Sequence, residues 1–148
     1  MNMKYNRGFT LIELLMVIAI IGLLSTVVLA ALSSARNKSN DAAVKSNLNS
    51  IRSAADLYFD NNGTSYGTFA AGNCVLGAGM FGNSTIINAI NSAIASGDGT
   101  SRCVASINAY AVAVGMKTAG QSWCIDSLGR AKQYSGTPTA AITGSSCN

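Results

Sequence analysis

The sequence predicts an α+β fold in which a long N-terminal helix packs against a small antiparallel β-sheet. Three observations support this prediction. The chain has 148 residues, enough for one small domain and an anchor but not for two cores. Apolar residues recur at helical spacing through the N-terminal third, and the C-terminal half carries short β-prone segments separated by turn residues.

The first half of the helix is apolar almost all round. Residues 14–32 contain no charged side chain, and these 19 residues span about 28 Å as a helix, close to the hydrocarbon thickness of a bilayer. Lys4 and Arg7 precede the run, so the positive-inside rule leaves the short N-terminus in the cytoplasm and sends the rest outward. We therefore expect a single-pass membrane segment, the stem, over residues 9–33.

Two ordinary explanations of this segment leave part of it unexplained. A secretory signal peptide has a shorter apolar region, of about 7–15 residues, and Glu13 is out of place within it. A simple signal anchor on a monomeric protein explains the length but not the position of Glu13. A carboxylate in a membrane helix is disfavoured unless it is paired. A cut after Gly8 would supply a cationic partner, the free amine of Phe9.

The stretch Gly8-Phe9-Thr10-Leu11-Ile12-Glu13-Leu14-Leu15 resembles the class III leader junction of type IV prepilins and the related pseudopilins, and the resemblance continues through Leu24. It covers about the first sixth of the chain. The resemblance implies that residues 1–8 are a leader peptide, which a membrane-embedded prepilin peptidase removes between Gly8 and Phe9. It further implies that Phe9 is N-methylated and that Glu13 is the assembly carboxylate, which meets the Phe9 amine of a neighbouring subunit.

The same resemblance implies a pilin-like fold and a structural role. We expect a subunit of a type IV pilus-like filament, a helical homo-oligomer, whose partners are the prepilin peptidase, a polytopic platform protein and a hexameric assembly ATPase. The precursor would lie in the cytoplasmic membrane with its head outside, and the filament at the cell surface. Two alternatives remain open: a pseudopilin of a type II secretion or DNA-uptake system, and a monomeric membrane-anchored adhesin or binding module.

The stem departs from the family in one respect. Many pilin stems carry a kinking proline where this chain has residues 28–31 of sequence Val-Leu-Ala-Ala, and the only proline is Pro138. Gly22, Ser25 and Thr26 are the positions expected to weaken the helix instead.

Residues 34–62 are predicted to continue the helix as an amphipathic distal stem. Asp41 and Lys45 are expected to form a favourable i,i+4 pair on its more exposed side. Gly63 supplies a stop. The apolar stripe of this segment has spacings of three and four and comprises Val44, Leu48, Ile51, Ala55 and Tyr58.

Residues 63–148 are predicted to form a globular head. A helix is expected over residues 84–96, capped by Asn83 or Ser84 and ended by Gly97. Trp123 is expected to lie in the core. The segments expected to form antiparallel strands are 106–114, 122–126 and 130–134, the last two joined by a turn at 126–129.

The chain has no histidine and four cysteines, all from residue 74 onward. An even number of cysteines after an export-type N-terminus indicates two disulfides in an oxidising compartment. Four cysteines allow three connectivities. Our interpretation favours the pairing that closes neighbouring loops, Cys74–Cys103 and Cys124–Cys147.

Nothing in the sequence points to catalysis. It contains no nucleophile–base pair, phosphate loop or metal-binding cluster, so we expect no enzyme activity, cofactor or metal. Asp98-Gly99 could contribute to a calcium loop of the kind that major pseudopilins carry, but few carboxylates surround it. The formal charge of +4 includes Lys4 and Arg7; without them 8 basic and 6 acidic side chains leave +2. This small and scattered charge argues against nucleic acid as the main ligand.

Overall fold

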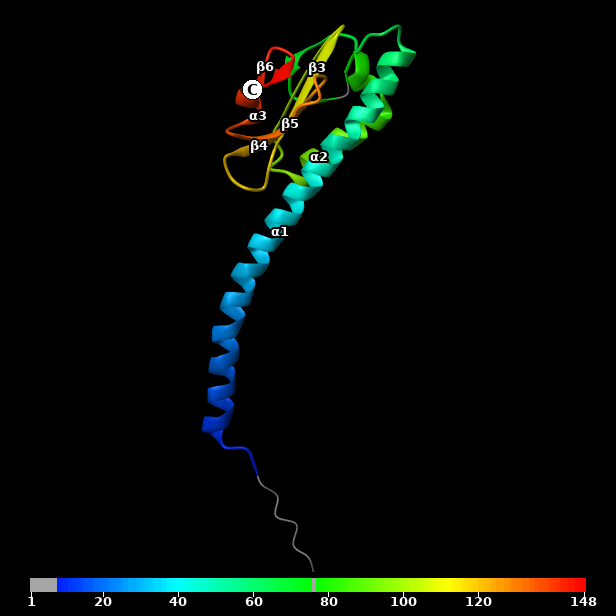
Figure 1. Cartoon of the computed structure of the whole chain (residues 1–148). Coiled ribbons are helices and arrows are strands. Elements are labelled where there is room, and N and C mark those ends of the chain that lie inside the picture. Colours follow the sequence, from blue (N-terminus) through cyan, green and yellow to red (C-terminus); the bar gives the residue numbers. More distant parts are fainter. Residues whose placement is uncertain (1–7, 76) are drawn as a thin grey trace, which may run out of the picture. The chain divides into compact units, whose positions relative to one another are not determined.

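The computed structural model describes residues 8–75 and 77–148, so Lys4 and Arg7 of the predicted leader peptide lie outside the described residues. One long helix, α1 (Leu11–Asn61), is followed by five strands that form a sheet (Figure 1). This arrangement confirms the predicted α+β class. The strands are β1 (Phe69–Gly72), β2 (Ser101–Ser106), β3 (Ala109–Gly115), β4 (Gln121–Asp126) and β5 (Ala131–Ser135).

Shorter elements complete the chain. A 3-10 turn, η1 (Gly79–Gly82), and helix α2 (Ser84–Ser96) lie between β1 and β2, and α3 (Pro138–Ala141), β6 (Ile142–Thr143) and β7 (Ser146–Cys147) follow β5. The chain divides into two compact units with the boundary after Arg36. We call residues 8–36 the N-terminal unit and residues 37–148 the C-terminal unit.

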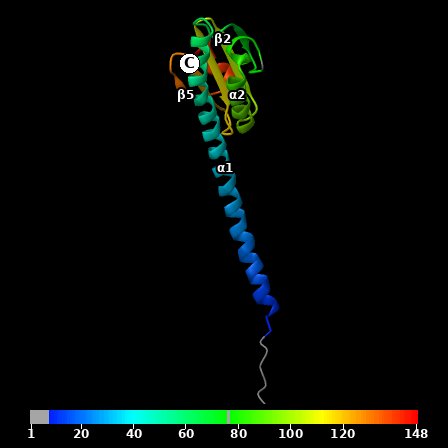
Figure 2. The ribbon, with the colours of Figure 1, turned by 90° about the vertical axis from the view of Figure 1, so that its right-hand side faces the viewer.

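The sheet is antiparallel throughout, with strand order β1-β2-β3-β4-β5. Side chains alternate between its faces, as the pleat requires. Tyr110, Val112 and Val114 of β3 face α2 and the distal part of α1, whereas Ala111 and Ala113 face the C-terminal segment. The two views in Figures 1 and 2 show α2 beside the distal part of α1. The C-terminal unit therefore has three layers.

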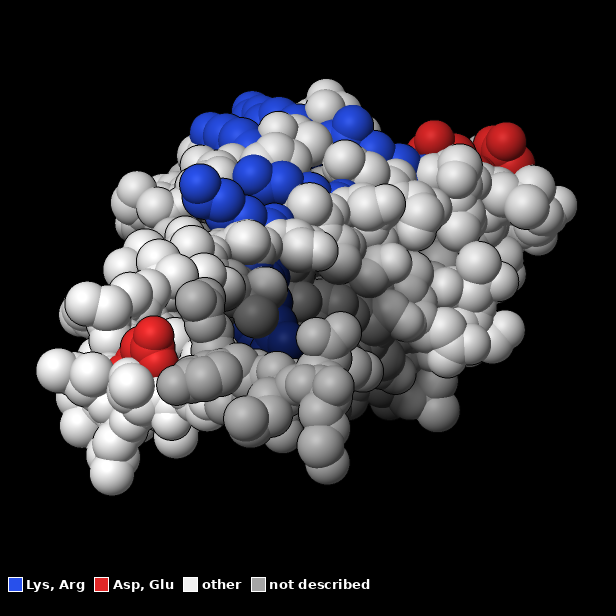
Figure 3. All heavy atoms as spheres, turned by 90° about the horizontal axis from the view of Figure 1, so that it is seen from below, with Lys and Arg blue, Asp and Glu red and all other residues white. Residues whose placement is uncertain are grey.

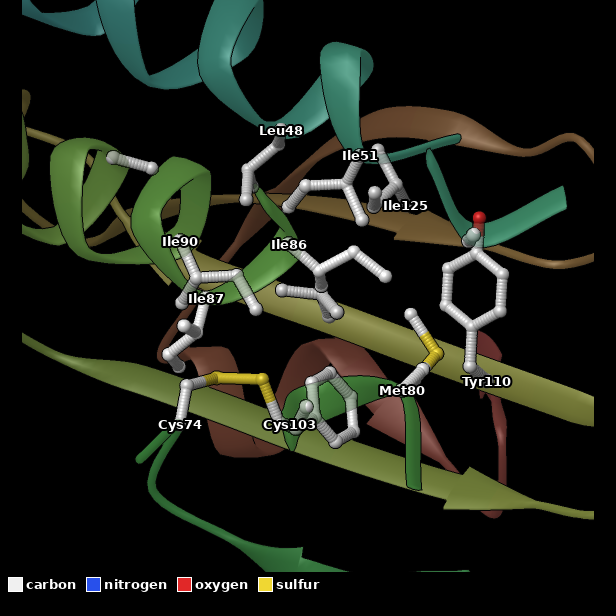
Figure 4. Packing of buried hydrophobic residues seen from close by; sticks show 14 of the residues in the cluster. Leu48, Ile51, Cys74, Met80, Ile86, Ile87, Ile90, Cys103, Tyr110 and Ile125 are labelled. Atoms are coloured by element: carbon white, nitrogen blue, oxygen red, sulfur yellow. A yellow bond between two sulfur atoms is a disulfide. The ribbon is translucent and has the colours of Figure 1, made fainter. Parts of the chain in front are cut away.

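The distal part of α1 contributes the predicted apolar stripe to the core. Val44, Leu48, Ile51 and Ala55 are fully buried, and the half-buried Tyr58 packs against them. Helix α2 adds its own stripe of isoleucines, and Figure 4 shows how side chains from α1, α2 and the sheet interdigitate. Trp123 packs against the same core and is half-buried. Burying each such side chain contributes about 1.5–3 kcal/mol.

Local capping explains why α2 covers the residues predicted for it. The Asn83 side chain accepts hydrogen bonds from the backbone N–H groups of Thr85 (3.0 Å) and Ile86 (3.3 Å). These bonds satisfy two donors that the first helical turn leaves free. At the other end, the Gly97 N–H donates to the Ala93 carbonyl.

The prediction of one strand over residues 106–114 was wrong at its start. Ser106 pairs with Ala109 across a tight turn, so the exposed Ile107 lies in that turn between β2 and β3. Strands β1 and β2 were not predicted. Their residues include few strong β-formers, and cross-strand pairing rather than local preference holds them in place.

The structure contains two disulfides, Cys74–Cys103 and Cys124–Cys147. The first joins the segment after β1 to β2, and the second joins β4 to β7. The short C-terminal strand is thereby attached to the far face of the sheet, where Ala141 and Ile142 also pack.

The predicted Asp41–Lys45 pair does not form, and Asp41 does not lie on an exposed side. Asp41 is only 6% exposed and accepts hydrogen bonds from the backbone N–H groups of Lys117 (2.7 Å) and Thr118 (3.3 Å) and from the Thr118 hydroxyl. Three donors in a loop distant in sequence satisfy this carboxylate, so it needs no lysine.

Candidate functional site

The N-terminal end of α1 carries the predicted processing and assembly residues. Gly8, Phe9 and Thr10 precede the helix in non-helical backbone, and Phe9 is 87% exposed. A Cβ built on Gly8 would meet nothing within 4 Å. The peptide bond between Gly8 and Phe9 is therefore accessible, and the described residues leave room for a larger side chain than glycine at position 8.

The Glu13 carboxylate folds back onto the start of its own helix. Its Oε2 accepts hydrogen bonds from the Thr10 backbone N–H (2.9 Å) and the Thr10 hydroxyl (2.7 Å), and the Glu13 N–H donates to the Thr10 Oγ1 at 3.4 Å. This reciprocal pattern is a capping box. Two orphan N–H groups of the first turn are satisfied by it.

Thr10 was not singled out as a site residue in the sequence. The signal was present, because threonine followed three residues later by glutamate is the capping-box pattern. Both hydrogen bonds to the carboxylate end on Oε2. Among the described residues, no lysine or arginine forms an ion pair with Glu13. The ion pair found in the described residues lies in the C-terminal unit and joins Arg130 to Asp126.

Around Glu13 and C-terminal to it, as far as Leu32, α1 presents an apolar surface on all sides. Every large apolar side chain between Leu11 and Leu32 is at least 44% exposed. By length and composition α1 could cross a membrane, and none of its most apolar stretch is buried within the chain. An exposed apolar surface of this extent indicates a lipid or protein partner.

The helix is continuous through the positions expected to weaken it. The Ser25 hydroxyl donates to the Ile21 carbonyl (2.7 Å) and the Thr26 hydroxyl to the Leu23 carbonyl (2.8 Å). Both hydroxyls thus find acceptors in the preceding turn, which makes them compatible with an apolar environment.

The Asp98-Gly99 segment forms a turn. Asp98 Oδ1 accepts hydrogen bonds from the Thr100 N–H (2.8 Å) and hydroxyl (2.6 Å). Within the described ranges, no three Asp, Glu, Cys or His side chains converge as a metal site would require. The structure gives no support to a calcium loop here.

Comparison with known proteins locates the similarity. The prokaryotic N-terminal methylation motif matches residues 3–29. The type IV wide pilus major component of Thermus thermophilus is 46% identical over 61 residues, which cover 40% of this chain and 47% of that protein. The type II secretion system core protein G of Klebsiella michiganensis is 36% identical over 63 residues, or 42% of this chain and 44% of that protein.

Each match spans less than half of the relative's length. No solved structure matches the chain significantly. The matched motif covers the Gly8–Phe9 junction and most of the apolar surface described above. The chain thus carries the prokaryotic N-terminal methylation motif, and over its matched segment it is similar to the major component of a type IV wide pilus and to a core protein of a type II secretion system.

Proposed function

We propose that this protein is a non-enzymatic structural subunit of a type IV pilus-like filament. The observation that carries the proposal is the apolar surface of α1 from Leu11 to Leu32, which has no partner within the described chain. Such a helix is stable in a bilayer or in a bundle of identical helices. A subunit stored in the membrane and later stacked into a filament uses both environments in turn.

Processing is proposed to occur between Gly8 and Phe9. A prepilin peptidase would cut this bond and methylate the new Phe9 amine. The exposed, non-helical backbone at the junction supports access by a protease. Because space around Gly8 is open, the requirement for glycine would come from the peptidase and not from folding.

Glu13 is proposed to guide assembly through the amine that cleavage creates. Thr10 donates both of its hydrogen bonds to Oε2 of the carboxylate, and no described residue donates to Oε1, which can accept a charge-assisted hydrogen bond from the Phe9 amine of a neighbouring subunit. In a bundle of apolar helices, an unpaired carboxylate would be strongly disfavoured. A subunit added in the wrong register would bury such a group, which selects the correct register.

The proposed partners follow from the sequence of membrane storage, cleavage and assembly. The precursor lies in the cytoplasmic membrane with the C-terminal unit outside, and the processed subunit joins a homo-oligomeric filament at the cell surface. A membrane platform protein and an assembly ATPase would act on it, because moving an apolar helix out of lipid requires coupled work. Two disulfides would suit an oxidising exterior.

N-terminal sequencing and intact-mass measurement of the native protein test this proposal. We expect a chain that begins at Phe9, is heavier by one methyl group, and is lighter by four hydrogens because of the two disulfides. Filaments built from chains that still begin at Met1 would contradict it.

A second candidate is a pseudopilin, favoured by the similarity to the type II secretion core protein G. Deletion of the gene separates the two. Loss of long surface filaments supports the pilus, whereas loss of protein secretion without loss of such filaments supports the pseudopilin. A monomeric anchored adhesin would instead be recovered as detergent-stable monomers that retain residues 1–8.

A further inference from the structure

The surface of the C-terminal unit is more positive than its sequence suggests. Of its five carboxylates, Asp41 and Asp126 are buried and accept internal hydrogen bonds. Asp98 is exposed but already accepts two hydrogen bonds from Thr100. Asp56 and Asp60 are therefore the carboxylates available to a partner. In Figure 3, Lys and Arg side chains gather on one side of the molecule.

A pocket of about 410 Å³ lies between α1, the β3–β4 connection and β5. Lys38 and Lys45 supply its positive charge, and Gln121 and Gln133 supply carboxamide groups. The charge of Asp41 is already stabilised by donors of the Lys117-Thr118 segment. The complete lining is Lys38, Asp41, Ala42, Lys45, Met116, Thr118, Gln121 and Gln133.

Lys45 is held in place within this pocket. Its Nζ donates to Gln133 Oε1 at 3.1 Å and lies 4.8 Å from the centre of the Trp123 ring, and Gln133 in turn hydrogen-bonds Gln121. In the part of the chain that the structure describes, Lys45 has no carboxylate within ion-pair distance. A cation fixed in this way loses little entropy when it binds an anion.

The distal end of α1 carries two carboxylates that have no cationic partner among the described residues. Asp56 and Asp60 are exposed and one turn apart, so their charges repel each other. Both lie near the C-terminus of α1, which ends at Asn61 and has no basic residue in its last turn. The helix macrodipole disfavours negative charge at this end. Neither carboxylate has an ion-pair partner among the described residues, so both are available to a cation of another molecule.

We propose that the pocket containing Lys38 and Lys45 binds Asp56 and Asp60 at the distal end of α1 of a second copy of this chain. This inference rests on the proposed function, in which copies lie side by side. Charge complementarity selects this occupant over other proteins or surfaces.

The two surfaces cannot pair within one copy. Lys45 and Asp56 are 11 residues apart on the same helix, a distance of about 16 Å along its axis. Between copies, the contact is heterologous, because each copy offers one pocket and one acidic helix end. A heterologous contact that does not close into a ring generates an open filament. The contact therefore links the C-terminal units of successive copies, in addition to the packing of their apolar helices.

Charge reversal in the full-length chain tests the contact. Asp56→Lys with Asp60→Lys gives a copy with two positive surfaces, and Lys38→Glu with Lys45→Glu gives a copy with two negative surfaces. Each variant expressed alone is expected to give about tenfold fewer filaments, because like charges then face each other. Co-expression of the two should restore filaments, since positive and negative copies can alternate. Lys132→Glu, on an exposed β5 residue outside the pocket, is the matched control and should assemble normally.

Zero-length carbodiimide cross-linking of wild-type filaments gives an independent measurement. With isotope-labelled and unlabelled subunits mixed, we expect peptides joining Lys38 or Lys45 of one copy to Asp56 or Asp60 of another. Thermal unfolding of each variant in detergent shows whether a loss of filaments comes from lost assembly or from lost folding. If the variant with Asp56→Lys and Asp60→Lys does not fold, the variant with Asp56→Asn and Asp60→Asn takes its place.

The outcomes distinguish the inference from the proposed function. Wild-type filament yield from the charge-reversed copies overturns the inference and leaves the proposed function intact. The inference is also overturned if a pocket variant assembles normally but no longer binds nucleic acid or anionic vesicles, because the pocket would then bind one of these and not a second copy. Absence of filaments from the unaltered, correctly processed protein in a competent host overturns both.

Discussion

The apolar side chains of α1 are exposed in the N-terminal half of the helix and form a buried stripe in the distal half. Between Leu11 and Leu32 they surround the helix, and each large one is at least 44% exposed. From Val44 to Ala55 they follow one stripe, and that stripe is fully buried against α2 and the sheet. A stripe can be covered by one neighbouring layer, whereas an all-round apolar surface needs a surrounding environment that the described residues do not supply.

The carboxylates of α1 show the same contrast. Asp41, in the C-terminal unit, has three donors from the Lys117-Thr118 segment and is buried. Glu13, in the N-terminal unit, is exposed and held by its own first turn through Thr10 alone. Asp41 therefore contributes to the stability of the subunit, and Glu13 is available for contacts with other molecules.

The largest expected effect is on assembly. Glu13→Ala should abolish filaments while leaving membrane insertion and the unfolding temperature of the C-terminal unit unchanged, because only the contact between subunits is lost. Electron microscopy of sheared filaments and membrane fractionation measure the two properties. Thr10→Val, which removes the capping hydroxyl but keeps the carboxylate, is the control and should still assemble. Normal filament yield from Glu13→Ala would refute the assignment of this residue to assembly.

Removal of a disulfide should act only on the C-terminal unit. Cys74→Ser with Cys103→Ser, or Cys124→Ser with Cys147→Ser, is expected to lower the free energy of unfolding by about 2–5 kcal/mol. The sequence separations, 29 and 23 residues, are similar, so loop entropy alone predicts similar losses. Chemical denaturation in detergent measures them. Reduced membrane insertion of either variant would show that the two units are less independent than we infer.

Asp41→Ala should lower the free energy of unfolding by about 1–3 kcal/mol, because it removes the charged acceptor of the hydrogen bonds that the backbone N–H groups of residues 117 and 118 donate. Lys45→Ala should cost less than about 1 kcal/mol in the isolated subunit. Urea denaturation of both variants compares them. Equal losses would favour the Asp41–Lys45 pair that the sequence predicted and the structure does not contain.

Alkaline pH should destabilise the core of the C-terminal unit. Burial, with smaller contributions from Tyr66 and Asp56, raises the pKa of Tyr110, and burial with Asp56 and Asp60 raises the pKa of Tyr66. The folded state therefore favours neutral phenols. Below about pH 10 the tyrosines are neutral in both the folded and the unfolded chain, so the free energy of unfolding keeps its full value. Above about pH 10 the tyrosines of the unfolded chain ionise first, and the free energy of unfolding falls by up to about 1.4 kcal/mol per pH unit for each group.

The alkaline effect is measured by unfolding the protein at a series of pH values. Tyr110→Phe should flatten the decline above pH 10 relative to wild type, even if it changes stability at neutral pH. An unchanged slope in this variant would mean that Tyr110 ionises as readily in the folded protein as in the unfolded chain.

Local signals explain which parts of the fold the sequence predicted. Helix α2 begins and ends where Asn83 and Gly97 indicated, since capping depends on adjacent residues. Strands β4 and β5 lie within one residue of their predicted bounds, because the turn between them has its own residue signature. Strand β1 was missed because its residues, Phe69–Gly72, form a strand only through pairing with β2.

The sequence alone determined the apolar length of α1, the position of Glu13 relative to Gly8 and Phe9, and the spacing of the buried stripe, because each depends on residues a few positions apart. Only the tertiary structure decided which donors satisfy Asp41, which cysteines are joined, and that Lys45 lies in a pocket over Trp123. These depend on segments up to about 90 residues apart, such as Lys45 and Gln133, that meet only when the sheet has formed. Side chains distant in sequence compete for the same partner, and the folded geometry selects among them.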